Sequence, residues 1–289
     1  MRSRNHYLLA VAILATACVA GERHHDRISR KWPADGIRHI DLHEVDGSVD
    51  IEGTNSNEIT LDADIRRRGI RPDPSKENNG FFEAKIEGDT LSIGRRGERR
   101  VHFPMFFRSR DLTVDYTLHV PRSVSLEVRT VNGRVETRSM DGETRVVTVN
   151  GPIDLESGGT QEVSAHTVNG RVKARFLYAF QGASLKTVNG SVDAELPPNA
   201  SFACDLSQMN GDFEAAFPLN IHSHPGNRRV SGEVNGGKYD LRIVTVNGDI
   251  RIETVTPPTP STPPAIAAPP AVPGSPAIPA PPAPPAPRT

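Results

Sequence analysis

Two histidines and a row of carboxylates are the side chains with the clearest capacity for chemistry. His222 and His224 are separated by one residue, so on a strand they share a face and could bind a metal together. Acidic residues at matching places in a repeated pattern could form a calcium-binding stripe. These residues are Glu136, Asp154, Asp193 and Glu214. The histidines lack a third nearby ligand, and Lys173 and Arg251 interrupt the acidic row. We therefore predict no metal site and no cofactor.

Catalytic motifs are absent from the sequence. It has no Gly-x-Ser-x-Gly nucleophile elbow, no phosphate-binding loop and no His-Glu-x-x-His pair. Of its two cysteines, Cys204 lies in an apolar stretch typical of a small buried side chain. The formal net charge of -1 argues against nucleic acid as the main partner, because binding phosphates needs a net basic surface. We predict that the protein is not an enzyme and does not bind nucleic acid.

One segment combines basic and aromatic side chains. Phe103, Phe106 and Phe107 lie in a frame of arginines that includes Arg99 and Arg100. Aromatic rings can enter the interface of a bilayer while arginines bind anionic headgroups, so the segment could contact a lipid surface. Repeat arrays also need a cover at each end of their apolar core, and we favour this capping role for the three rings.

The N-terminus has the features of an export signal. Arg2 and Arg4 precede an apolar run over residues 7–17, which is too short to span a bilayer as a helix. We predict a signal peptide over residues 1–17. Residues 18–37 are expected to be a flexible tether between the signal and the folded part.

A cysteine follows this signal. The stretch Ala15-Thr16-Ala17-Cys18 resembles the lipobox of bacterial lipoproteins, with alanine at the position where leucine is usual. The resemblance implies that Cys18 becomes the lipidated first residue of the mature protein. Val19 follows in place of the aspartate of an inner-membrane signal, which favours anchoring in the outer membrane, facing the periplasm or the cell surface. Ordinary secretion, with Cys18 lost or unmodified, is the alternative.

A four-residue pattern, Thr-Val-Asn-Gly, recurs through the second half of the sequence at intervals of about 20 residues. Its full and degenerate copies contain the pairs Asn132-Gly133, Asn150-Gly151, Asn169-Gly170, Asn189-Gly190, Asn210-Gly211, Asn235-Gly236 and Asn247-Gly248. An outlying relative, Asp46-Gly47, has aspartate in place of asparagine. A repeat of this length suits one coil of a β-solenoid, or one hairpin with its connection.

Each Asn-Gly pair is predicted to be a corner. Apolar and polar residues alternate on both sides of the pair, but the parity changes at it, which requires a turn or bulge. Glycine reaches positive φ without steric cost, and asparagine tolerates it. A hairpin turn would need only Asn-Gly, whereas stacked coils also align the preceding Thr and Val.

We therefore predict an all-β fold, a β-solenoid similar to a parallel β-helix. Stacked asparagine amides would bond to one another, and the valine on each side of the corner would face the core. An antiparallel hairpin array or a sandwich is the alternative. Strand-like alternation over residues 38–65 and 81–94 extends the β-repeat domain to residues 38–256, with a loop insertion over residues 217–229. Residues 257–289 are rich in proline and alanine and are expected to form a disordered tail.

A known family shares these features. The strand Tyr116–Pro121 (YTLHVP), followed by LEVRTVNG over residues 126–133, resembles the bacterial "putative adhesin" family of β-strand-repeat domains of unknown function. The resemblance covers about residues 38–254 and implies a β-solenoid in the cell envelope with no known catalysis. It supplies no site residues.

Two functions fit such a domain. The first is an adhesin-like module that binds a glycan, a lipid or a protein. The second is a structural or stress-linked envelope component with no specific ligand. Binding predicts an exposed aromatic or charged stripe on one face of the solenoid, whereas the structural role predicts evenly polar faces.

Overall fold

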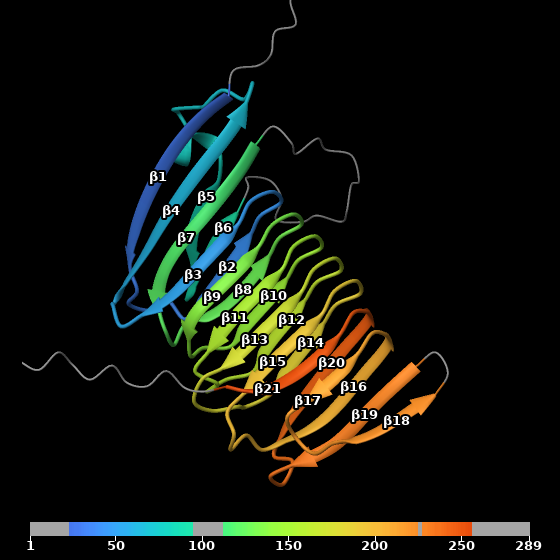
Figure 1. Ribbon diagram of the computed structural model, residues 1–289. Coiled ribbons are helices and arrows are strands. Elements are labelled where there is room, and N and C mark those ends of the chain that lie inside the picture. Colours follow the sequence, from blue (N-terminus) through green and yellow to red (C-terminus); the bar gives the residue numbers. More distant parts are fainter. Residues whose placement is uncertain (1–22, 95–111, 225–226, 256–289) are drawn as a thin grey trace, which may run out of the picture. The chain divides into compact units, whose positions relative to one another are not determined.

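The computed structural model describes residues 23–94, 112–224 and 227–255, all within one compact unit (Figure 1). These residues form two β-sheets, of 10 and 11 strands, and a short 3-10 helix, η1 (Glu77–Gly80). In spatial order, sheet A contains β1 (Arg23–Pro33), β4 (Glu58–Arg68), β7 (Leu112–Pro121), β3 (Val49–Thr54), β9 (Val135–Met140), β11 (Ile153–Ser157), β13 (Val172–Phe176), β15 (Val192–Leu196), β21 (Ile250–Thr254) and β17 (Phe213–Ala215).

Sheet B has its own spatial order, which again departs from the order of the sequence. It contains β18 (Asn220–His224), β19 (Asn227–Val234), β16 (Phe202–Asn210), β20 (Tyr239–Asn247), β14 (Ala183–Lys186), β12 (Val163–His166), β10 (Thr144–Val147), β8 (Ser125–Arg129), β2 (His39–His43), β6 (Thr90–Gly94) and β5 (Glu83–Glu87).

The central coils each contribute one strand to each sheet, as β8 with β9, β10 with β11, β12 with β13 and β14 with β15. Neighbouring coils pair in parallel, so equivalent residues lie in register. Val135, Ile153, Val172, Val192 and Ile250 form one such row, and all are buried between the sheets. Branched side chains suit these packed strands. The β-solenoid prediction is confirmed, and the parallel pairing of the repeats excludes the hairpin array for them.

The last coil of the sequence is not the last coil in space. After β15 the chain forms β16 and β17, then the antiparallel pair β18–β19, and then returns to insert β20 and β21 into the stack. Strand β20 lies between β14 and β16, and β21 lies between β15 and β17. The loop insertion predicted over residues 217–229 is wrong, because this stretch contains β18 and the start of β19.

The first strands also depart from the predicted domain limits. Residues 23–33, placed by the sequence in a flexible tether, form β1, which pairs with β4 from Arg23↔Arg68 to Pro33↔Glu58. Ile28 is buried and Trp32 packs against the core. The half-buried Arg30 and the exposed Lys31 between these two residues hid the apolar side of the strand. The signal peptide, Cys18, residues 95–111 and the tail from residue 257 lie outside the described part of the chain.

Candidate functional site

Six of the seven predicted Asn-Gly pairs come together in one column at the corner between the sheets. Each asparagine Nδ2 donates to the Oδ1 of the residue in the adjacent coil, over 2.8–2.9 Å. In spatial order this asparagine ladder contains Asp46, Asn132, Asn150, Asn169, Asn189, Asn247 and Asn210. Asn247 precedes Asn210 because the last coil is inserted.

The ladder has a direction. Every side-chain amide points its N–H groups toward Asp46, whose carboxylate can only accept. The carboxylate therefore ends the ladder where the partial positive charges of the amides point. The aspartate that made Asp46-Gly47 an outlying copy in the sequence is the residue type that suits this end.

Asn235-Gly236 does not belong to the ladder. Asn235 lies in the connection between β19 and β20 with a φ of 51°, and its Nδ2 donates to the backbone oxygen of Ala200 at 2.9 Å. No asparagine of the ladder has a positive φ. Asparagine is thus required in the ladder for its amide and not for a left-handed backbone.

The glycines of the column are required by close approach. A Cβ on Gly170 would lie 2.0 Å from the backbone oxygen of Gly151, and a Cβ on Gly190 would lie 2.0 Å from that of Gly170. The backbones of successive coils therefore meet at this corner with no room for a side chain. The positive-φ explanation offered by the sequence is wrong for these two glycines.

The threonine of each repeat, and not the valine before the asparagine, faces the interior. The hydroxyls of Thr167, Thr187 and Thr245 donate to glycine oxygens of the preceding coil over 2.9–3.1 Å. Val168 and Val188 are 39% exposed, which corrects the prediction that these valines face the core. The sequence already indicated that the threonine faces inward. Leu126, Val128 and Thr130 share one parity before the first corner, so the threonine lies on the same side of the strand as the apolar residues.

Replacing Asn169 with aspartate is expected to lower the free energy of unfolding by about 1 kcal/mol. The substitution removes the donor to Asn150 Oδ1 and sets a carboxylate oxygen against that acceptor. Urea denaturation followed by circular dichroism measures the effect. The matched control is Asp46→Asn, which keeps an acceptor for Asn132 and should cost less. Equal losses in the two variants would contradict the direction of the ladder.

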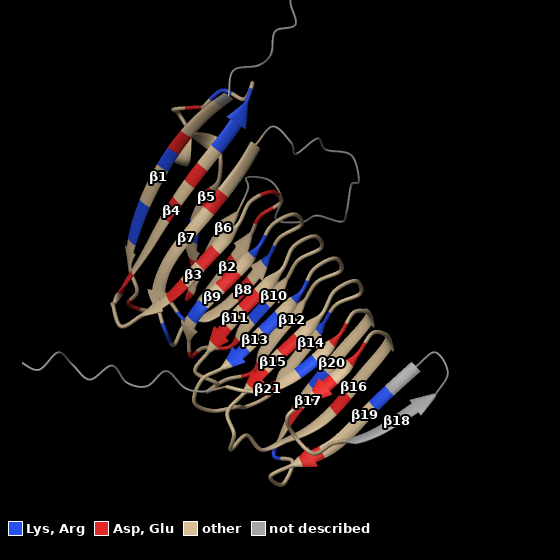
Figure 2. Ribbon diagram, in the orientation of Figure 1, with Lys and Arg blue, Asp and Glu red and all other residues tan. Residues whose placement is uncertain are grey.

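The outer face of sheet A carries opposite charges that compensate one another. Glu52 on β3 lies beside Arg138 on β9, and Glu156, Arg175 and Glu195 follow one another on β11, β13 and β15 (Figure 2). In the neighbouring row, Asp50, Glu136 and Asp154 adjoin one another on β3, β9 and β11. Arg175 on β13 reaches Glu156 at 3.6 Å and Glu195 at 2.7 Å, one on each neighbouring strand. Burial opposes ionisation of Glu195, but hydrogen bonds from Arg175 and Lys173 hold the pKa of its carboxyl below the usual value. This face matches the evenly polar surface expected of a structural role.

The acidic row that was considered as a calcium site lies on this same face, with its carboxylates close to arginines. Glu136 and Asp154 pair with Arg134, at 3.4 and 2.7 Å. Asp193 pairs with Arg171, and Glu214 lies 3.9 Å from Arg251. Among residues 23–94, 112–224 and 227–255, no cluster of three or more His, Cys, Asp or Glu could hold a metal ion. The side chains of His222 and His224 lie outside the described part.

The outer face of sheet B carries cations that lack such partners. Its cationic patch consists of Arg145, His166, Lys186 and Arg242, with Ser164 and Ser184 among them. Lys186 and Arg242 make no ion pair within the described residues, and Arg145 reaches only Glu127, at 3.6 Å. The Nε2 atom of His166 is buried and has no hydrogen-bond partner there. The patch is a charged stripe of the kind that a binding role predicts.

His166 is expected to make the folded state less stable in mild acid. Burial, with the charges of Lys186 and Arg145, lowers the pKa of His166 below its usual 6.5, so the fold favours neutral imidazole. The contribution of neutral His166 to the free energy of unfolding is therefore fully present above about pH 6.5, and it is lost as the pH falls through the folded-state pKa. Urea denaturation of His166→Gln from about pH 7 to 5 should show a smaller loss than the unmodified chain. An equal loss of unfolding free energy between about pH 7 and 5 in the two proteins would contradict this role of His166.

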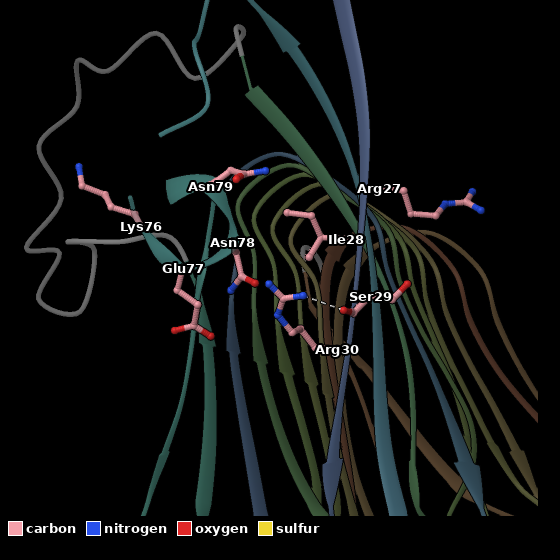
Figure 3. A pocket seen from close by; sticks show the side chains of 8 residues that line it. All are labelled: Arg27, Ile28, Ser29, Arg30, Lys76, Glu77, Asn78 and Asn79. Atoms are coloured by element: carbon pink, nitrogen blue, oxygen red, sulfur yellow. Dashed lines mark hydrogen bonds between the residues drawn. The ribbon is translucent and has the colours of Figure 1, made fainter. Parts of the chain in front are cut away.

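One pocket, of about 380 Å³, lies between β1 and the η1 region (Figure 3). Asn78 there is 3% exposed, and its Oδ1 has no partner within the described structure. Arg30 donates to the backbone oxygen of Ser29, and the side chains of Arg27 and Lys76 point away from Asn78. Glu77 is the one carboxylate among the lining residues, and within the described structure no hydrogen bond or ion pair joins it to the other side chains of the pocket.

The stacked coils and the asparagine ladder belong to a repeat that a known protein family shares. The family model Toastrack DUF4097 matches residues 31–253. The chain belongs to this family. The match confirms the resemblance to a family of β-repeat domains that was inferred from the Thr-Val-Asn-Gly copies. No curated protein matches this Toastrack chain.

Several solved structures match the Toastrack domain at low sequence identity. One is a putative cell adhesion protein from Clostridium sporogenes ATCC 15579, with 10% identity and a TM-score of 0.43 over 80% of this chain and 100% of that one. A putative adhesin from Bacteroides fragilis NCTC 9343 has 11% identity and a TM-score of 0.29, over 80% and 97%. A putative lipid binding protein from Parabacteroides distasonis ATCC 8503 has 9% identity and a TM-score of 0.27, over 80% and 97%.

Within the described part of the Toastrack domain, no helix is long and apolar enough to cross a bilayer.

Proposed function

We propose that this Toastrack domain is a non-catalytic envelope lipoprotein that presents its β-solenoid as an adhesin-like binding surface. The observation that carries the proposal is the difference between its two outer faces. On sheet A, Arg134, Arg171 and Arg175 each have a carboxylate within ion-pair distance. On sheet B, Lys186 and Arg242 have none within the described residues. Exposed charges left without protein partners are available to a ligand.

Screening of the mature chain against a glycan array and a lipid overlay tests this function. The chain should start at residue 18 with Cys18→Ser, so that it is soluble without its anchor. A specific ligand on either surface is the expected result. The absence of any ligand on both would contradict a binding role.

The membrane anchor is proposed to be a lipid on Cys18, after export and cleavage of residues 1–17. Only residues 19–22 separate Cys18 from the start of β1, and a chain of this length spans at most about 17 Å. The anchor would therefore hold the first end of β1 close to the bilayer, proposed to be the outer membrane. Labelling of cells with palmitate should mark the protein, and Cys18→Ala should remove the label. Unchanged labelling would contradict the anchor.

A lipid contact by the basic and aromatic segment is a proposal that fits this anchor. The segment, residues 95–111, is followed directly by Leu112, the first residue of β7. Leu112 pairs with Arg67 of β4, and Arg67 pairs with His24 of β1, so the end of the segment emerges beside the start of the domain. Phe82 already packs edge-on against Tyr116 in the core near this end, with ring centroids 5.7 Å apart. This favours a lipid contact over the cap.

Vesicle binding tests the contact. Phe103, Phe106 and Phe107, changed together to serine, should weaken binding of the Cys18→Ser chain to phosphatidylglycerol vesicles. Arg99 and Arg100, changed to glutamine, should reduce the salt dependence of that binding. Unchanged binding in both variants would contradict a role of these residues at the lipid surface.

The second candidate is a structural or stress-linked envelope component with no specific ligand. The compensated outer face of sheet A favours it. Loss of envelope integrity on deletion of the protein, in a cell whose protein binds nothing on the array or the overlay, would support this candidate over the first.

A further inference from the structure

The cationic patch has a regular arrangement across four parallel strands. Arg145, Ser164, Ser184 and Arg242 occupy one row in register on β10, β12, β14 and β20. Adjacent strands are about 4.8 Å apart, so the two arginines stand about 14 Å apart with two short hydroxyl side chains between them. The next row of the same face places His166 beside Lys186. The patch thus presents positive charges around a centre that small side chains leave open.

The nearest carboxylates leave this centre free of negative charge. The row of the two arginines continues to Glu127 and Asp41 on one side and to Asp205 on the other. Glu127 pairs with Arg129 and lies 3.6 Å from Arg145, and Asp205 pairs with Arg229 at 3.1 Å. A separate acidic row, formed by Glu143, Glu162 and Asp240, lies at the start of the same strands and makes no ion pair with the patch. The carboxylates of this face therefore lie beyond the two arginines or in the separate acidic row, and the positions between the arginines hold only Ser164 and Ser184.

We propose that the outer face of sheet B binds an anionic polysaccharide, whose carboxylate or phosphate groups are held by Arg145, Lys186 and Arg242. This inference rests on the proposed binding function and names its ligand class. The serine hydroxyls between the arginines are suited to hydrogen bonds with sugar hydroxyls. The acidic row along one side disfavours a negatively charged bilayer, which would have to lie flat over both rows.

The openness of the patch selects a polymer over a small anion. An ion pair at an exposed site contributes little in water, because solvent screens it. The pocket of about 380 Å³ is lined by residues of β1 and the η1 region and by none of the patch residues. A polymer can engage several cations at once, and each further contact then forms at high effective concentration.

Titration with three probes tests the proposal. The mature chain with Cys18→Ser is titrated with polygalacturonate, with its methyl ester, which has the same backbone and no charge, and with phosphatidylglycerol vesicles. Binding to polygalacturonate, lost on methyl esterification and weakened by salt, is the expected result. Equal affinity for the methyl ester, or binding to the vesicles alone, would overturn the proposal.

Variants locate the binding. Arg145→Gln, Lys186→Gln and Arg242→Gln together should weaken binding about tenfold or more. The matched control on sheet A, Arg138→Gln with Lys173→Gln and Arg251→Gln, changes the net charge equally and should leave affinity within about twofold. Arg145→Lys with Arg242→Lys should retain binding, which guards against a folding defect. Unchanged affinity in the first variant would overturn the proposal.

The array and the overlay separate this inference from the proposed function. If the chain binds a neutral glycan or a lipid and the sheet B variant binds it equally well, the proposed function is supported and the polysaccharide site is contradicted. If the chain binds no ligand at all, both the binding function and the polysaccharide site are contradicted.

Discussion

Replacing Gly170 with alanine is expected to lower the free energy of unfolding by about 3 kcal/mol or more. The new Cβ would lie 2.0 Å from the backbone oxygen of Gly151 and 2.6 Å from its carbonyl carbon. Neither atom can rotate away, because both belong to the stacked corner. The coils would have to separate, and the bond from Gly170 N to Asn189 O would be strained with them. Urea denaturation of the variant measures the loss.

The control for this prediction is Gly88→Ala. A Cβ on Gly88 would meet nothing within 4 Å, although its φ of 65° favours glycine. The expected cost is only that of a left-handed residue, about 1 kcal/mol. A Gly170→Ala chain as stable as this control would show that the corner can open without cost, which would contradict close stacking as the reason for glycine.

Truncation after Gly237 is expected to abolish cooperative folding. The deletion removes β20 and β21, including the buried side chains of Leu241, Ile243, Ile250 and Ile252. Each contributes about 1.5–3 kcal/mol of apolar burial, so the sum is comparable to the whole net stability of a domain, about 5–15 kcal/mol. The deletion also separates β16 and β17 from the rest of the stack, because the lost strands lie between them and β14 and β15. Thermal denaturation by circular dichroism provides the measurement.

The control for the truncation ends the chain at Pro257. It keeps every described strand, and its melting temperature is expected to match that of the full chain. If the longer truncation, after Gly237, also melted cooperatively near that temperature, the inserted position of the last coil would be wrong. The two end points therefore distinguish loss of an inserted coil from loss of a terminal segment.

Local patterns in the sequence were enough for the fold class and for the asparagine column. Parity changes at Asn132-Gly133 and its copies required corners, and the repeated Thr and Val required that the corners stack. These are properties of neighbouring residues and of a period, and a parallel solenoid converts a period directly into contact. The shared parity of Thr130 with Leu126 and Val128 also indicates that the threonines face the core, although the valines beside them were predicted to do so.

Other features depended on contacts between residues far apart in the chain. Pairing with β4 makes a strand of residues 23–33, whose own alternation is masked by charged side chains. Insertion of β20 between β14 and β16 places Asn247 before Asn210, and no local signal distinguishes this order from the sequential one. The cationic patch arises in the same way, because Arg242 reaches Ser184 only through that insertion. Side-chain alternation along a strand is local, but the choice of neighbouring strand is made by the packing of the whole core.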